Sequence, residues 1–123
     1  MAMTAVTRRH LTDEQVASYH RDGYVAVRGL LDEAQVDTLR RVTERFVERS
    51  RSVSKSDDVL DLDPRHTAAA PVLRRIKNPA DHDPLYRWVA LDSPIPDIVA
   101  ELIGPAIRFH HSKLNLKGSF VGA

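Results

Sequence analysis

The sequence predicts an α+β domain, in which capped helices are interspersed with short segments of β-forming residues. Two segments begin with a helix-capping pattern, and residues 24–28, 72–76 and 107–117 have the character of strands. The chain has 123 residues, of which 42% are apolar and 28% charged, as expected for one globular domain. We therefore expect a flexible arm over residues 1–10, followed by a single domain over residues 11–123.

The first two helices are predicted from their capping boxes. Thr12 caps the first helix with Gln15 at the box position, and Gly23 supplies the left-handed residue that ends it. Asp32 caps the second helix, which we expect to continue to about Ser50. The near-helical apolar spacing of the second helix predicts a buried stripe of Val36, Leu39, Val42 and Phe46.

Between and after these helices, β-forming segments predict strands. Residues 24–28 (YVAVR) follow a glycine directly, and residues 72–76 (VLRRI) are closed by an Asn-Pro pair. Residues 51–71 lack a regular pattern and predict a long loop, with a brief strand at residues 59–62.

Two further helices are predicted from proline positions. Asp83-Pro84 begins the third, with Leu85, Trp88 and Val89 directed inward. Pro94 ends it, and Pro96 lies in the first turn of the fourth helix, which ends at Gly104-Pro105. The buried face of the fourth helix is predicted to contain Ile98, Val99, Leu102 and Ile103. Residues 107–117 then predict the longest strand.

Composition excludes several classes of protein. A formal net charge of +1 argues against binding nucleic acid through bulk charge, and the absence of cysteine excludes disulfides and catalytic thiols. No apolar run approaches the ~20 residues of a membrane span. The first nine residues lack the apolar core of a secretory signal, so we expect a cytoplasmic protein that binds neither nucleic acid nor membrane.

Six histidines raise the question of a metal site. His20-Arg21-Asp22 has the His-x-Asp form of an iron motif, but its position at a helix end favours a structural role. Asp81-His82-Asp83 fits a helix-entry turn with Asp83 as the cap. The adjacent pair His110-His111 is predicted to point to opposite faces of a strand, with one ring lining a pocket.

Two predicted strands carry cations without nearby acids. Residues 106–123 contain Arg108, Lys113 and Lys117 and no acid, and Arg74, Arg75 and Lys77 form a second cluster. Such cations can hold a small dicarboxylate through charge-assisted hydrogen bonds. They can equally be ordinary strand cations whose stems cover apolar surface. The residues alone leave both interpretations open.

The order of these segments resembles the N-terminal part of the phytanoyl-CoA dioxygenase family. The matching segments are residues 11–15 (LTDEQ), 19–31 (YHRDGYVAVRGLL), 75–79 (RIKNP) and 112–117 (SKLNLK). The resemblance implies a dioxygenase that uses Fe(II) and 2-oxoglutarate to hydroxylate a small organic substrate. It also implies a double-stranded β-helix, or jelly roll, whose barrel is incomplete in residues 11–123.

The resemblance further implies roles for three residues in binding 2-oxoglutarate. Lys77 matches a basic family residue that contacts this cofactor, Lys113 occupies a cofactor-lining position, and Asn115 lies on the same strand face. The iron ligands of similar proteins follow the segment that ends here, so we expect no catalytic or metal-binding residue in this chain. We expect Fe(II) and 2-oxoglutarate to bind only the complete protein, with neither bound to this chain alone and no turnover by it. The alternative is a truncated, non-catalytic binding or dimerisation module that uses the open sheet edge.

Overall fold

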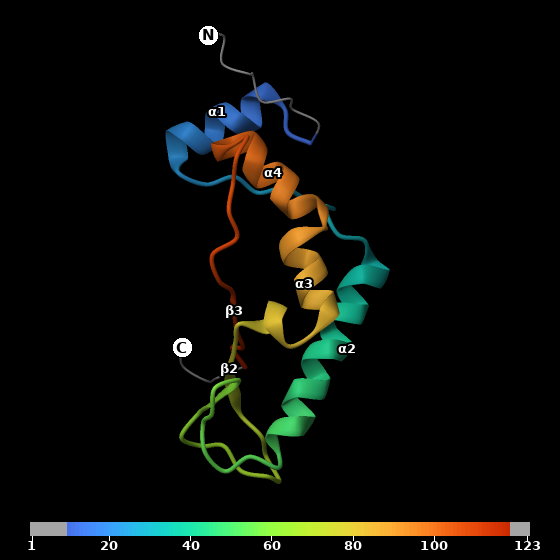
Figure 1. Cartoon of the computed structure of the whole chain (residues 1–123), viewed down its shortest axis with the longest axis vertical. Coiled ribbons are helices and arrows are strands. Elements are labelled where there is room, and N and C mark those ends of the chain that lie inside the picture. The colour runs from blue at the N-terminus through green and yellow to red at the C-terminus, as the bar shows by residue number, and fades with distance from the viewer. Residues whose placement is uncertain (1–9, 119–123) are drawn as a thin grey trace.

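The computed structural model describes residues 10–118, which form an elongated molecule (Figure 1). At one end, α1 (Asp13–Asp22) contacts α4 (Pro94–Ile103), and at the other, α2 (Glu33–Ser50) and α3 (Pro84–Leu91) accompany a small sheet. The combination of helices with an antiparallel sheet agrees with the predicted α+β class. Over the described range, no helix is long and apolar enough to cross a bilayer.

Both predicted capping boxes are confirmed. The Thr12 hydroxyl accepts a hydrogen bond from the Gln15 N–H at 3.1 Å, and the Gln15 side chain accepts one from the Thr12 N–H at 2.8 Å. Asp32 and Gln35 make the same reciprocal pair at 2.7 and 2.9 Å. Gly23 ends α1 with φ of 83°, a left-handed conformation that side chains other than glycine adopt at a cost.

The predicted strand at residues 24–28 is wrong. The segment is irregular, and the Tyr24 side chain is 71% exposed. No strand of the described region pairs with this segment, and β propensity reflects packing against a neighbouring strand as much as the residue itself. Val27 instead packs against a small apolar cluster that joins the two helices at this end, consisting of Leu11, Val16 and Ile98.

The sheet has three antiparallel strands in the order β1 (Leu60–Leu62), β2 (Leu73–Lys77) and β3 (Lys113–Asn115). The predicted strands near residues 59–62 and 72–76 are therefore confirmed. Asn78, with φ of 47°, turns the chain out of β2 into a short 3-10 helix, η1 (Pro79–Asp81).

The predicted strand over residues 107–117 is much shorter in the structure. Only Lys113–Asn115 pair with β2, while residues 107–112 run without a regular partner between α4 and the sheet. The alternation of faces is confirmed around the paired part, where Leu114 and Leu116 pack on the core while Lys113 and Asn115 are exposed.

The main core lies between one face of the sheet and the helices α2 and α3. Its fully buried residues are Leu60 and Ile76, both at 0% exposure. From α2, Val42 and Phe46 are buried as predicted, while Val36 and Leu39 are half-buried. The remaining buried members of this cluster are Leu73 and Tyr86.

The helices α3 and α4 differ from the prediction in detail. In α3, Tyr86 is the buried residue, and its hydroxyl is 2.7 Å from the Thr43 hydroxyl on α2. The α4 helix already begins at Pro94, because the Ser93 hydroxyl accepts a hydrogen bond from the Ile95 N–H and caps it there. Ile103, expected in the core, is 62% exposed at the last turn.

The irregular loop over residues 51–71 is confirmed, and hydrogen bonds fasten it to the end of α2. The Arg51 guanidinium donates to the carbonyl groups of Ala68 and Ala69. His66 contacts the Val53 carbonyl through Nε2 at 3.1 Å, and its Nδ1 accepts from a backbone N–H at 3.0 Å. Polar contacts therefore order the loop together with the apolar packing of Val53 and Val59 against the main core.

Asp63 at the end of β1 should make stability sensitive to acid. Hydrogen bonds from the Arg65 side chain and backbone lower the pKa of the Asp63 carboxyl from 3.8 to about 2. A lowered pKa stabilises the folded state above pH 3.8, and this contribution disappears as the pH falls towards 2. In denaturant titrations, the advantage of the wild type over Asp63→Asn should be constant from about pH 5 to 7 and shrink below about pH 4. An advantage of the wild type over Asp63→Asn that is the same at about pH 2.5 as at about pH 6 would contradict this assignment.

Candidate anion-binding site

The pairing of β2 with β3 places two lysines directly opposite each other. Lys77 is the cross-strand partner of Lys113, and Arg75 is the partner of Asn115. Paired residues of antiparallel strands project from the same face, so these four side chains lie on the face opposite Ile76, away from the core. The alternation that buries one face of the sheet therefore gathers three cations and an amide on the other, where Asp61 of β1 is the partner of Arg75.

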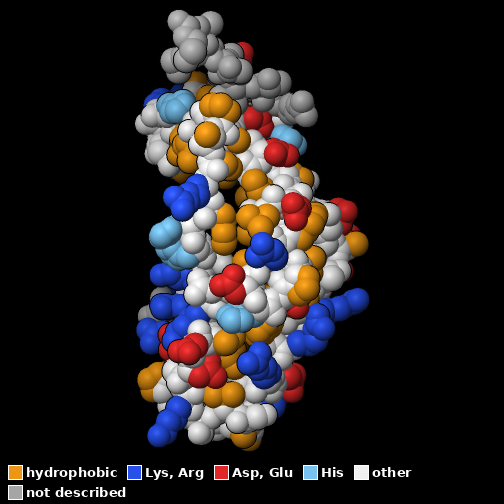
Figure 2. All heavy atoms as spheres, in the orientation of Figure 1, with side chains coloured by type: hydrophobic (Ala, Val, Ile, Leu, Met, Phe, Trp, Pro, Cys, Tyr) orange, Lys and Arg blue, Asp and Glu red, His pale blue; other side chains and the backbone are white. Residues whose placement is uncertain are grey.

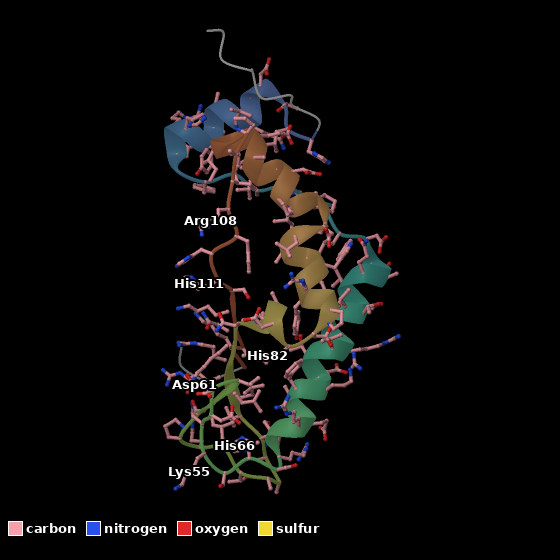
Figure 3. The ribbon with its side chains drawn as sticks, viewed as in Figure 1. Lys55, Asp61, His66, His82, Arg108 and His111 are labelled. Atoms are coloured by element: carbon pink, nitrogen blue, oxygen red, sulfur yellow. The ribbon has the colours of Figure 1, made fainter. Side chains whose placement is uncertain are left out.

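These side chains border a shallow pocket of about 230 Å³. In Figure 2, lysine, arginine and histidine side chains gather along the same flank of the molecule, and Figure 3 places His111 on the segment that leads into β3. Within the described part of the chain, no carboxylate lines the pocket, whose residues are Arg75, Lys77, Asn78, His111, Ser112 and Lys113.

Hydrogen bonds hold two of the three cations in place. The Arg75 Nε donates to the Asn115 Oδ1 at 3.1 Å, and the Lys77 Nζ donates to the Asp57 carbonyl at 2.8 Å. The Lys113 ammonium has no hydrogen-bond or ion-pair partner among residues 10–118. Lys113 is therefore the cation of the pocket that is most available to a ligand.

The two lysines repel each other across the strand pair. Like charges directly opposite each other on neighbouring strands destabilise a sheet. A favourable cross-strand pair stabilises it by roughly 0.2–1 kcal/mol, and the destabilisation by like charges is of similar size. Neither Lys77 nor Lys113 has an acidic side chain in an ion pair with it within the described part of the chain. A bound dianion would reverse the sign of this interaction and would receive charge-assisted hydrogen bonds from both lysines.

The structure brings together two of the three residues that the resemblance implies. Lys77 and Lys113 both line the pocket. Asn115 is outside the lining, but it pairs with Arg75 on β2 and accepts a hydrogen bond from the side chain of Arg75, which does line the pocket. Arg75 and His111 were not assigned a role in binding the cofactor. The spacing of Arg75 could have indicated its place at the pocket. Arg75 lies two residues before Lys77 on a strand, and alternate residues of a strand share a face.

The sequence motifs that resemble metal ligands have structural roles. The Asp22 carboxylate accepts hydrogen bonds from Arg21 and Ser18 at the end of α1. Asp83 caps α3, with its Oδ1 accepting from the Leu85 N–H at 2.8 Å. Across residues 10–118, no three histidine, aspartate or glutamate side chains gather as a metal site.

The prediction for His110 and His111 is wrong in its geometry. Their rings do not point to opposite faces but meet edge to face, with centroids 4.6 Å apart. The reason is that residues 110–112 precede the paired part of β3, so strand alternation does not constrain them. His111 lines the pocket, as expected for one of the two rings.

An apolar groove of about 620 Å³ lies between α3, α4 and residues 106–109. Figure 2 shows hydrophobic side chains around this hollow. Among residues 10–118, four of the five large exposed hydrophobic side chains line it, namely Leu91, Ile103, Ile107 and Phe109. Ile103 was predicted to lie in the core, and Ile107 and Phe109 on a long strand, so the sequence did not predict the groove.

Comparison with known proteins agrees with the order of segments described above. The family model of phytanoyl-CoA dioxygenase matches residues 19–123, which is more than half of the chain. No curated protein matches the sequence. The match begins within α1 and extends over the sheet and the cationic pocket. The chain therefore belongs to the phytanoyl-CoA dioxygenase family.

Proposed function

We propose that this chain forms the 2-oxoglutarate-binding wall of an Fe(II)- and 2-oxoglutarate-dependent dioxygenase that hydroxylates a small organic substrate. The observation that carries the proposal is the pocket between β2 and β3, which is lined by Arg75, Lys77 and Lys113 and by no acid. Membership of a dioxygenase family supports the reaction class.

The donors in the pocket suit a dicarboxylate. The Lys113 ammonium offers three N–H donors and Lys77 retains two beyond its bond to the Asp57 carbonyl. Because Asn115 accepts from Arg75 through Oδ1, its amide NH₂ remains a donor. When bound, 2-oxoglutarate supplies the reducing electrons of the family's oxygen chemistry through its oxidative decarboxylation.

The described residues do not suit iron in the same way. The family uses Fe(II), but residues 10–118 hold no group of three side chains that fits a metal. The role proposed for this chain's residues is therefore binding of 2-oxoglutarate alone. Our proposal places the open sheet β1–β2–β3 as the first strands of a jelly roll, with the cationic face turned towards its interior.

The proposal departs from the expectation that this chain alone binds no cofactor, because the described residues already form a cationic pocket. Titration of the purified chain with 2-oxoglutarate tests it. We expect saturable binding by calorimetry, and we expect Lys77→Ala and Lys113→Ala each to weaken it about 5- to 10-fold, since each removes a charge-assisted hydrogen bond. The matched control is Lys55→Ala, which removes the same charge from an exposed loop position far from His111 (Figure 3). Lys55→Ala should change the affinity less than about 2-fold.

A second ligand separates specific binding from general attraction to a cationic surface. Pentanoate has the same chain length with a single carboxylate, so we expect it to bind at least about 10-fold more weakly. Equal effects of Lys55→Ala and Lys113→Ala, or equal affinity for the two ligands, would contradict a dicarboxylate site on this face.

A further inference from the structure

We propose that Asp57 is a positioning residue for Lys77, whose ammonium it holds through the Asp57 backbone carbonyl. The inference rests on the proposed 2-oxoglutarate site and adds a residue outside the pocket lining. The contact that carries it is the hydrogen bond from Lys77 Nζ to the Asp57 carbonyl oxygen, at 2.8 Å.

The turn that presents this carbonyl is built by the Asp57 side chain. Its Oδ1 accepts hydrogen bonds from the Val59 and Leu60 N–H groups at 2.8 and 2.7 Å. The Asp57 N–H donates to the Leu60 carbonyl at 2.9 Å, which closes the turn from the other side. Hydrogen bonds from the Leu60 and Val59 N–H groups lower the pKa of the Asp57 carboxyl, so it is ionised at neutral pH.

The same turn is fixed to the strand that carries the lysine. The Lys77 N–H donates to the Val59 carbonyl at 2.8 Å, so the backbone and the side chain of Lys77 both attach to residues 57–59. Leu60, the next residue, is fully buried and pairs with Ile76. The turn is therefore anchored in the core on one side and holds the ammonium on the other.

This tether leaves Lys77 competent to bind an anion. An ammonium has three N–H donors, and the Asp57 carbonyl uses one of them. The long lysine side chain normally loses rotamer freedom when it binds a ligand, and a side chain that is already held loses less. Lys113, by contrast, has no partner within the described residues and must be ordered by the ligand itself.

Two substitutions of Asp57 separate the turn from the charge. Asp57→Asn removes the charge but keeps an oxygen that can accept from the Val59 and Leu60 N–H groups. Asp57→Glu keeps the charge but adds a methylene group that displaces the carboxylate from this short turn. The matched control is Asp58→Asn, which removes a charge from the exposed neighbouring residue.

The first measurement needs no ligand. The chain contains four lysines, Lys55, Lys77, Lys113 and Lys117, so an amine-acetylating reagent gives four rates that mass spectrometry can resolve. We expect Asp57→Glu to raise the rate at Lys77 at least about 3-fold relative to Lys113, because it releases the tether. Asp57→Asn and Asp58→Asn should leave this ratio within about 1.5-fold of the wild type.

The second measurement is the affinity for 2-oxoglutarate. We expect Asp57→Glu to weaken the binding of 2-oxoglutarate about 3- to 5-fold. Asp57→Asn and Asp58→Asn should each leave the affinity unchanged or raise it slightly, because each removes a negative charge that repels the ligand. An unchanged Lys77 rate in Asp57→Glu, or equal affinities of Asp57→Glu and wild type, would overturn the positioning role. If the wild type binds no 2-oxoglutarate, the proposed function fails, while the acetylation rates still decide whether Asp57 holds Lys77.

Discussion

Replacing Ile76 with alanine is expected to lower the free energy of unfolding by about 3 to 4 kcal/mol. Ile76 is fully buried on β2, the central strand of the sheet, where it pairs with Leu60 on one side and Leu114 on the other. Its side chain joins the sheet to the cluster that contains Phe46 from α2. Removing it costs the transfer of three carbon atoms out of the core and leaves a cavity that neighbours on two strands and a helix cannot easily fill.

The chain offers a matched control for this substitution. Ile103→Ala makes the same chemical change at a position that is 62% exposed, so we expect it to cost less than about 1 kcal/mol. Urea unfolding followed by circular dichroism gives both values. A difference between Ile76→Ala and Ile103→Ala of less than about 1 kcal/mol would mean that the sheet and α2 do not share the core described above.

The helices were predictable because their signals are local. A capping box needs only residues i and i+3, and both Thr12 and Asp32 satisfy it within a single turn. Asp83 caps α3 in the same local manner. The burial of Tyr86 was missed because it depends on where α3 lies relative to α2 and Thr43, which are distant in the sequence.

The strands were less predictable because a strand requires a partner. Residues 24–28 contain three β-forming residues, yet nothing pairs with them in the described part of the chain. Residues 107–112 have the same alternation as Lys113–Asn115 and differ only in lying beyond the reach of β2. Pattern alone indicates which residues can form a strand, and the tertiary structure decides how many of them do.

The candidate site was predictable in composition and unpredictable in geometry. Lys77 and Lys113 came from the resemblance to a family, but their direct opposition depends on the register of β2 with β3. A shift by one residue would place one of the two lysines opposite an apolar neighbour and on the other face. The contact between Lys77 and the Asp57 carbonyl depends on the course of the loop, which no pattern in residues 51–71 indicates.

Glu101 holds the start of the described chain against α4. Its side chain is only 4% exposed, and its Oε1 accepts hydrogen bonds from the His10 and Leu11 N–H groups at 3.1 and 3.3 Å. Its Oε2 is 3.1 Å from the His10 Nδ1. The predicted flexible arm, residues 1–10, lies outside the described residues except for His10, which these contacts fasten to the helix.

Replacing Glu101 with alanine is expected to lower the free energy of unfolding by about 2 to 3 kcal/mol. The substitution leaves two backbone N–H groups beside α4 without their acceptor, and a buried donor without a partner costs its full desolvation. Glu101→Gln should lower the free energy of unfolding by less, because its amide oxygen still accepts the hydrogen bonds. As a control, Glu44→Ala on the exposed face of α2 should leave the free energy of unfolding within about 0.5 kcal/mol of the wild-type value. Hydrogen exchange in α1 locates the effect, since α1 contacts α4 beside this carboxylate. Unchanged exchange in α1, or equal costs for Glu101→Ala and Glu44→Ala, would show that Glu101 does not hold the two helices together.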